Sequence, residues 1–306
     1  MHGAPDIFPA AFLNARAKSA ALTCTAVLLW GCAPVGTRYL VGDSQVGLPA
    51  VPFIGLRYAL AGLCFLPLLV WGKVWRWSRA DLALAALCAL VGVTGYNLPN
   101  AVGARTVSAG MVGVLNGVEP LLIVLMMALR QRRIPKGAIL LAGLVGLAGI
   151  GLLVHGAGPA MGNARGIALV LFGAFCWALY CVLVPPLLYR KGAVVVSAMT
   201  MSLGSLPMLA AGGAGIPHLA LQMTALQWDI MLAMVLGTSV LAMLCWNIGS
   251  VGLGPEQAGW FLYLLPVVSL AGGAIFLREA LTLREFLGGG LIMVSVFLSQ
   301  RQGKAT

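Results

Sequence analysis

The stretch GARTVSAGMVGVLNGVEPLLIVLMMALRQRRIPKGAILLAG (residues 103–143) has a counterpart 146 residues later, GSVGLGPEQAGWFLYLLPVVSLAGGAIFLREALTLREFLGG (residues 249–289). Aligned without a gap, the two stretches share identical residues that include Gly103 with Gly249, Pro120 with Pro266, Ala128 with Ala274, Arg132 with Arg278 and Gly143 with Gly289. A register offset by 147 pairs Trp30 with Trp177 and Val35 with Val182. Two related copies in an apolar chain are typical of transporters built from internal repeats.

The composition predicts an all-α integral membrane protein. Hydrophobic residues make up 60% of the chain and charged residues only 9%, with a mean hydropathy of +0.98. Charged residues are roughly a quarter of a soluble domain. Because a spanning helix needs roughly 20 apolar residues, the chain has room for about ten transmembrane helices. The seven cysteines lie in apolar stretches without metal-ligand spacing, so we expect no metal site and no cofactor.

The apolar runs predict the domain organisation. We expect spans at 19–40, 50–71, 80–101, 106–129, 137–155, 166–187, 193–212, 227–249, 256–277 and 284–300. The predicted units are an N-terminal tail (1–18), a first five-helix repeat (19–155), a linker (156–165), a second five-helix repeat (166–300) and a C-terminal tail (301–306). Residues 1–18 lack the features of a cleaved secretory signal, so we expect this tail to be retained.

Lysine and arginine positions predict the orientation. With the N-terminus in the cytoplasm, the inner side receives Arg16, Lys18, Lys73, Arg76, Arg79, Arg130, Arg132, Arg133, Lys136, Arg190, Lys191, Arg301 and Lys304. The outer side receives Arg38, Arg105, Arg165, Arg278 and Arg284. This excess predicts cytoplasmic termini in a bacterial inner membrane. Because each repeat has an odd number of spans, the second enters from the opposite side, and the repeats are inverted. The topology explains the net positive charge of the chain. We therefore expect the protein to contact the lipid bilayer and not to bind nucleic acid.

Residues able to act as catalytic acids, bases or nucleophile partners are rare within the predicted spans. Most acids lie at span ends, and no phosphate-binding loop is present, so we expect neither an enzyme nor an ATP-driven pump, and no catalytic residue. Glu119 is the exception, near the middle of the fourth span. It could couple protons or bind a substrate ammonium, or it could be protonated and hydrogen-bonded within a kinked helix. Arg57 also lies inside a span, where anchoring or snorkelling explains it at least as well as a functional role.

Proline, aromatic and amide residues near the middle of the spans predict the hinges, the substrate-binding residues and the inner gate. Pro120 and Pro266 each remove a helical amide at matched depths, so we expect both to act as hinges. The predicted substrate-binding residues are Trp30, Tyr96, Asn97, Asn100, Trp177 and Tyr180. The predicted inner gate consists of Trp246, Asn247, Trp260 and Tyr263. Ordinary helix packing is the alternative for any one of these residues. As a set they suit a small amphipathic molecule better than an inorganic ion.

A family resemblance is carried by motifs along the chain. These are Leu29-Trp30-Gly31, Leu56-Arg57-Tyr58, residues 104–109 with Glu119-Pro120, Cys176-Trp177-Ala178, Leu265-Pro266 and Arg278-Glu279. On these motifs the chain resembles the EamA branch of the drug/metabolite transporter superfamily along essentially its whole length. The resemblance implies two inverted five-helix repeats, a central cavity and alternating access without ATP. The chain is most similar to bacterial exporters of aromatic and other neutral amino acids.

Three departures from the family pattern bear on function. Leu265 replaces the glutamate expected before the second proline, and Arg132-Arg133 stands where the second repeat has Arg278-Glu279. The first span carries no acid, which argues against a small cation-drug antiporter. We expect a secondary exporter of neutral and aromatic amino acids or related metabolites, with proton coupling left open. The alternatives are an efflux pump for drugs or hydrophobic cations, and a membrane sensor or scaffold that transports nothing.

Overall fold

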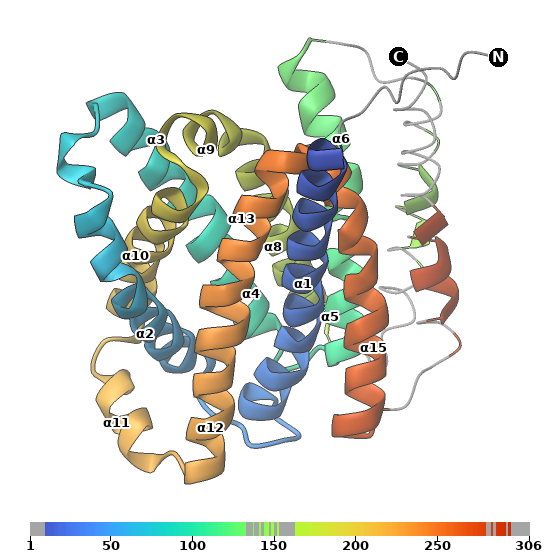
Figure 1. Cartoon of the computed structure of the whole chain (residues 1–306). Coiled ribbons are helices and arrows are strands. Elements are labelled where there is room, and N and C mark those ends of the chain that lie inside the picture. Colours follow the sequence, from blue (N-terminus) through green and yellow to red (C-terminus); the bar gives the residue numbers. More distant parts are fainter. Residues whose placement is uncertain are drawn as a thin grey trace.

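The computed structural model describes residues 10–132 and 163–279, with isolated positions between 137 and 152 and between 283 and 294. All regular elements of this described part are helices (Figure 1). The α-helices are α1 (Ala10–Val41), α2 (Ala50–Trp71), α3 (Arg79–Ala89), α4 (Gly95–Gly103), α5 (Ala109–Asn116), α6 (Glu119–Arg130), α8 (Ala164–Leu183), α9 (Pro185–Lys191), α10 (Ala193–Gly212), α11 (Gly215–Gln222), α12 (Ala225–Ala233), α13 (Ala242–Leu253), α14 (Pro255–Gly259) and α15 (Leu264–Leu277). Two short 3₁₀ helices, η1 (Val74–Arg76) and η4 (Trp260–Tyr263), and two π-helices, η2 (Leu90–Thr94) and η3 (Met234–Leu241), complete the set.

Eight helical segments in this part of the chain are long and apolar enough to cross a membrane. They are Ala15–Val41, Ala50–Trp71, Arg79–Gly103, Ala109–Arg130, Ala164–Leu183, Ala193–Gly212, Ala225–Leu253 and Gln257–Leu277. Each coincides with a predicted span. The other two predicted spans (137–155 and 284–300), most of the predicted linker and the C-terminal tail lie largely outside the described residues. α1 already begins at Ala10, so the second half of the predicted N-terminal tail is helical.

Polar caps define where several helices begin. The side chains of Ser78, Ser108 and Asn163 each accept a hydrogen bond from a backbone amide in the first turn of the helix that follows. Thr224 and Gln227 form a reciprocal capping box at the start of α12. Because the first amides of a helix have no partner within it, these caps satisfy groups that would otherwise be exposed to lipid headgroups or buried unpaired.

The first helices of the two repeats run in opposite directions. Arg38, near the end of α1, donates hydrogen bonds to the loop between α4 and α5, at the carbonyl oxygens of Ala104 and Arg105. Thr106 of the same loop donates to Asn163, the residue that caps the start of α8. α8 therefore begins on the face where α1 ends. Since α1 and α8 carry the matched Trp30 and Trp177, this arrangement establishes that the repeats are inverted.

Helix pairing follows the same pseudo-twofold symmetry. α1 packs along α13, and its counterpart α8 packs along α4. The other main pairs, α2 with α10 and α5 with α15, each join equivalent helices of the two repeats. Gly55 allows a close approach of α2 to α10, because a Cβ atom there would lie 2.7 Å from the carbonyl oxygen of Met208. The two repeats are thus interleaved around a shared interior.

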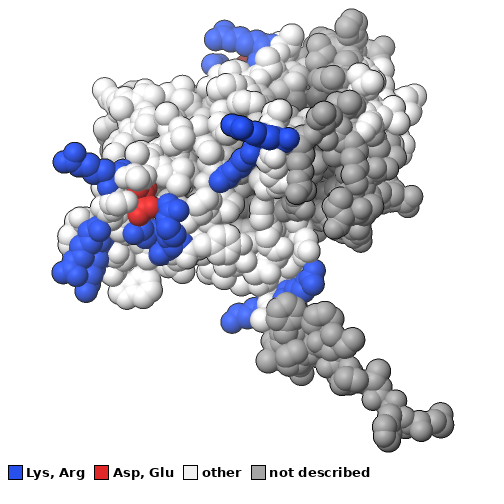
Figure 2. All heavy atoms as spheres, turned by 90° about the horizontal axis from the view of Figure 1, so that it is seen from above, with Lys and Arg blue, Asp and Glu red and all other residues white. Residues whose placement is uncertain are grey.

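Positive side chains gather on one face of the bundle, which we call the basic face. Figure 2 shows this face, where α3, α6 and α9 have their charged ends. Its exposed basic residues include Lys73, Arg76, Arg79, Arg130 and Arg190. The opposite face, where α1 ends and α8 begins, carries Arg38, Arg105, Arg165 and Arg278. This is the charge asymmetry on which the predicted orientation depends.

Candidate functional site

A cavity lies between the two repeats. Its walls come from α1, α2, η2, α4, α5, the start of α6, α8, α10, η3, α13 and α15. Of the predicted substrate-binding residues, five line this cavity: Trp30, Tyr96, Asn97, Asn100 and Trp177. Sequence reasoning missed other polar residues in the wall, namely Thr37, Tyr58, Asn116, Thr238, Ser239 and Ser269.

Tyr180 is not part of the cavity wall but lies behind it. Its ring stacks on Trp177, with centroids 5.0 Å apart and planes at 24°. Its hydroxyl donates to the Oδ1 atom of Asn247 (3.1 Å), and the Asn247 amide donates to Ser197 (2.8 Å). Tyr180 and Asn247 therefore satisfy each other and fix the Trp177 ring from behind.

Five aromatic rings form what we call the aromatic layer: Trp30, Tyr96, Trp177, Tyr180 and Trp246. Trp30 lies edge-on to Trp177 at a centroid distance of 5.0 Å, and Trp246 is 5.3 Å from Trp30 and 5.8 Å from Trp177. Tyr96 is 5.4 Å from Trp177. These separations lie within the range of favourable aromatic pairs. The rings come from both repeats, so the layer packs side chains of the first repeat against side chains of the second.

A second, smaller cavity lies toward the basic face. Its walls include Trp246, Leu188 and Tyr189, and the last two immediately precede Arg190. Trp30 and Trp177 line the central cavity, whereas Trp246 lines this second one, so the aromatic layer separates the two spaces. Of the other predicted inner-gate residues, Asn247 is buried at the layer. The side chains of Trp260 and Tyr263 lie outside the described part.

Three buried polar atoms of the cavity wall have no hydrogen-bond partner among the described residues. They are Oδ1 of Asn116, Oε1 of Glu119 and Nε1 of Trp177. Leaving a buried polar group unpaired costs roughly 1–3 kcal/mol, so such groups are rare unless a ligand or water satisfies them. All three residues line the same cavity, so one molecule bound there could contact a donor and two acceptors.

Glu119 is placed by a break in its span. α5 ends at Asn116, Gly117 and Val118 form a turn, and α6 begins at Glu119 with Pro120 next. The side chain is only 1% exposed, and a charged carboxylate at this depth costs a few kcal/mol. Because its Oε1 atom accepts no hydrogen bond in the described residues, the structure gives no support to the alternative of a carboxyl group satisfied within the kinked helix.

The two predicted hinge prolines occupy matched breaks. Pro120 is the second residue of α6, and Pro266 is the third residue of α15, which follows the 3₁₀ helix η4. Proline is well tolerated in a first helical turn because its missing amide would have no helical partner there. Each repeat thus divides its fourth span into two segments, and the proline starts the second segment.

Arg57 lies in the cavity wall and not at the surface. Its side chain is 3% exposed, so it neither anchors to nor snorkels toward the lipid headgroups. Its Nε atom donates to Ser239 (3.1 Å) and its Nη2 atom to Thr238 (2.5 Å). Both acceptors belong to the π-helix η3, a form that is frequent at functional sites. The indole of Trp30 donates to the carbonyl oxygen of Thr238 (2.9 Å), which ties the same turn to α1.

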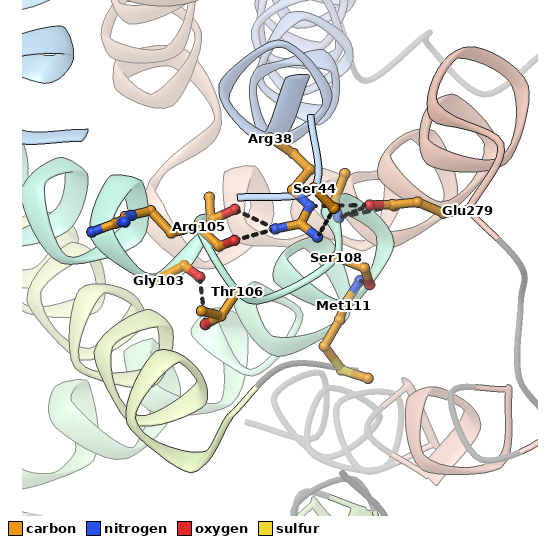
Figure 3. A network of polar contacts seen from close by, with 10 residues as sticks. Arg38, Ser44, Gly103, Arg105, Thr106, Ser108, Met111 and Glu279 are labelled. Carbon is orange, nitrogen blue, oxygen red and sulfur yellow. Dashed lines mark hydrogen bonds and ion pairs between the residues drawn. The ribbon is translucent and has the colours of Figure 1, made fainter. Parts of the chain in front are cut away.

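A polar network joins the repeats on the face opposite the basic face (Figure 3). Arg38 lies between the carbonyl oxygens of Ala104 and Arg105 on one side and Glu279 on the other, with Nε 3.5 Å from Oε1 of Glu279. The Glu279 carboxylate also accepts the backbone amide of Ala109, the first residue of α5 (3.0 Å). A negative charge at a helix start is stabilised by the helix dipole. The network links α1 and α5 of the first repeat to the end of α15.

A second ionic cluster joins the repeats on the basic face. Asp81 of α3 pairs with Arg190 (2.7 Å) and Lys191 (3.0 Å) at the end of α9. Arg130 at the end of α6 also donates to the carbonyl oxygen of Val182 in α8. Each face of the bundle therefore carries polar contacts between the first and the second repeat.

Metal chemistry has no candidate site in the residues that the structure describes. Within them, no group of three or more His, Cys, Asp or Glu side chains is arranged to hold a metal ion. The seven cysteines are free thiols, of which Cys88, Cys176, Cys181 and Cys245 are buried.

Comparisons with known proteins agree with this architecture. The chain matches the EamA-like transporter family twice, over residues 17–155 and 164–300, once in each repeat. It is 28% identical over 282 residues to an uncharacterized transporter of Archaeoglobus fulgidus, covering 90% of this chain and 96% of the relative. It is 27% identical over 294 residues to the uncharacterized inner membrane transporter YicL of Salmonella typhimurium, covering 92% and 95%.

A solved structure supports the fold. A crystal structure superposes with a TM-score of 0.65 at 19% identity, covering 94% of this chain and 98% of the other. The two family matches coincide with the two inverted halves that the helix directions reveal. With two such matches spanning nearly all of the chain, and an interior cavity between them, the protein belongs to the EamA-like transporter family.

Proposed function

We propose that this protein is a secondary transporter that exports neutral and aromatic amino acids or related small metabolites. The observation that carries the proposal is one cavity with both an aromatic wall and unpartnered polar atoms. An aromatic or aliphatic side chain would pack against Trp30, Tyr96 and Trp177. The ammonium group would find acceptors in Glu119 and Asn116, and the Trp177 indole would donate to an acceptor on the substrate.

Alternating access would use the two closures described above. The aromatic layer would be the inner gate, with Trp246 as its movable ring and Asn247 as its support. Trp260 and Tyr263, the first and last residues of η4, would complete that gate. The network around Arg38 and Glu279 would close the outer side, with the basic face in the cytoplasm of a bacterial cell. Breaking one closure while keeping the other would expose the cavity to one side at a time.

Movement between the two states would be concentrated at the span breaks. The helix breaks before Pro120 and Pro266 divide the fourth and ninth predicted spans at matched positions, which supports a hinge role for both prolines. Glu119 stands at the first of these breaks, next to the cavity. Its carboxyl group would bind either the substrate ammonium or a coupled proton, and its change of partner would accompany the bending of the span.

Efflux from reconstituted liposomes tests the proposal. Liposomes preloaded with labelled phenylalanine should release it faster with the protein than without it. Trp177→Ala and Tyr96→Ala should each lower the rate about tenfold, because both remove aromatic contact area at the cavity. Trp71→Ala is the matched control, since this tryptophan is 70% exposed at the end of α2. Unchanged rates in both cavity variants would contradict the proposal. Inhibition by a cationic dye but not by amino acids would instead favour a pump for hydrophobic cations.

A further inference from the structure

The guanidinium group of Arg57 is buried without an acidic partner. No carboxylate of the described residues lies within ion-pair distance of it, and its contacts are two hydroxyls and the ring of Tyr58, 5.2 Å from the guanidinium carbon. Arginine stays charged in proteins, and a buried unpaired charge is costly. The residue nevertheless lines an open cavity, where a bound molecule can reach it.

The contacts of Arg57 orient its charge without neutralising it. Thr238 donates its own hydroxyl proton to the carbonyl oxygen of Met234 (2.8 Å), so its oxygen is free to accept from Arg57. Ser239 accepts from the Nε atom, and no hydrogen bond of the described chain uses Nη1. The π-helix η3 brings both hydroxyls, from consecutive residues, onto one guanidinium. An oriented guanidinium with free donors is the arrangement that binds a carboxylate in a bidentate manner.

The opposite charge is available in the same cavity. Glu119 also lines it, yet Glu119 and Arg57 do not form an ion pair in the structure. If the two side chains paired, their charges would cancel and no ligand charge would be needed. Kept apart, they are complementary to a molecule that carries both an anionic and a cationic group. Asn116, with its unpartnered Oδ1 atom in the same wall, adds an acceptor for the cationic end.

We propose that Arg57 forms a carboxylate-binding subsite, positioned by Thr238 and Ser239, and that the substrates are α-amino acids with a free carboxylate. This inference rests on the proposed function and narrows it. Decarboxylated amines, amino-acid amides and cationic drugs lack the group that Arg57 binds. They also place a positive charge or a neutral group next to a buried guanidinium, which is unfavourable.

Three probes separate the subsite from the transport function: phenylalanine, phenylalaninamide and phenylacetate. Binding to purified protein in detergent is measured by calorimetry, and transport of each labelled probe is measured in liposomes. The unaltered protein should bind phenylalanine and phenylacetate, and bind the amide at least about tenfold more weakly. Arg57→Gln should weaken binding of both carboxylates about tenfold or more, and should leave binding of the amide unchanged or slightly tighter, because the buried positive charge is removed. Arg57→Lys keeps the positive charge but loses the planar guanidinium that can donate two parallel hydrogen bonds. Its affinity for the two carboxylates should fall by an intermediate factor.

Variants of the positioning residues keep the test independent of Arg57 itself. Thr238→Val and Ser239→Ala should lower the affinity for the two carboxylates several-fold without changing that for the amide. Thr94→Val is the matched control, since Thr94 of the π-helix η2 donates to the carbonyl oxygen of Gly204 (2.8 Å) and does not line the cavity. It should leave the ratio of carboxylate to amide affinity unchanged.

The outcomes distinguish the two proposals. Equal losses for phenylalanine and its amide in Arg57→Gln, or no binding of either carboxylate to the unaltered protein, would overturn the subsite. Arg57-dependent binding of phenylacetate, without transport of phenylalanine, would support the subsite while overturning amino-acid export. Transport of phenylalanine at an unchanged rate in the Arg57 variants would support amino-acid export and overturn the subsite.

Discussion

The two repeats share one scaffold but contribute different chemistry to the cavity. In the register offset by 147, Arg57 of the first repeat corresponds to Gly204 of the second, and in the register offset by 146, Glu119 corresponds to Leu265. The two acidic or basic side chains of the described cavity wall, Arg57 and Glu119, therefore both come from the first repeat. The second repeat has a close helix contact at the position of Arg57, because a Cβ atom on Gly204 would lie 2.5 Å from Cβ of Val93.

The matched tryptophans show the same division. The indole of Trp30 donates to the carbonyl oxygen of Thr238, whereas the indole of Trp177 has no partner in the described part. Tyr180 supports Trp177 from behind, and the corresponding residue of the first repeat is the small Ala33. The comparison teaches that the repeats share their helix path and the matched proline breaks, while the charged and hydrogen-bonding groups of the cavity wall differ between them, and it is these differences that we propose to serve substrate recognition.

Making the repeats alike at Glu119 should have the largest effect. Glu119→Leu copies the residue of the second repeat and removes the acceptor for the substrate ammonium or the proton. We expect phenylalanine efflux from liposomes to fall by a factor on the order of 100, as when one partner of a buried charged contact is removed. Val267→Ala, at an exposed position of α15, is the control and should keep the rate. A Glu119→Leu protein with an unaltered rate would mean that the difference between the repeats is not functional.

A methyl group at Gly204 should have the next largest effect, on stability. In Gly204→Ala the new Cβ atom would clash with Val93 and would lie 2.9 Å from the carbonyl oxygen of Ala89, so α10 and α3 must separate. We expect a loss of about 1–3 kcal/mol, visible as a lower midpoint of thermal unfolding in detergent. Gly259→Ala is the control, because a Cβ atom there would meet no atom of the described residues within 4 Å. Equal unfolding midpoints for the two variants would contradict a close contact between Gly204 and Val93.

Trp30 and Trp177 should respond differently to loss of the indole nitrogen. Of the three predictions, this one has the smallest expected effect. Trp177→Phe removes a donor that no described residue uses and that we assign to the substrate, so the affinity for phenylalanine should fall about fivefold, equivalent to about 1 kcal/mol. Its thermal stability should change little. Trp30→Phe leaves the Thr238 carbonyl oxygen without this partner, so its main effect should be a lower unfolding midpoint. Identical responses of the two variants, in calorimetry and in unfolding, would remove the distinction drawn between the repeats.

Much of the fold could be predicted from the sequence because lipid imposes strong conditions on it. A spanning segment must be long, apolar and helical, so the predicted spans 50–71 and 193–212 have the same ends as α2 and α10. The internal repeat and the odd number of spans predicted the inversion. The π-helices could not be predicted, because the sequences LVGVT and MVLGTSVL have no feature that distinguishes them from regular helix.

The sequence predicted how deep in the membrane the site residues lie, but not which way their side chains point. Hydropathy places a residue along the membrane normal, but helices that are apolar all round do not indicate which side faces the cavity. Tyr180 shares a helical face with Trp177, yet it lies behind that ring. Arg57 was correctly placed inside a span, and only the contact with η3 reveals that it faces inward. Asn116 precedes the break at Glu119, and its position near the proline was the one signal that could have identified it.

The aromatic layer also has a consequence for energy conservation in the cell. Protons cross proteins along continuous chains of water or titratable groups, and the three indole rings of the layer, one pair edge-to-face and two pairs tilted, pack at centroid distances of 5.0–5.8 Å, which disfavours such a chain. With this layer intact, we expect the resting protein to leak few protons, so that a cell could keep many copies in its membrane without dissipating the proton-motive force.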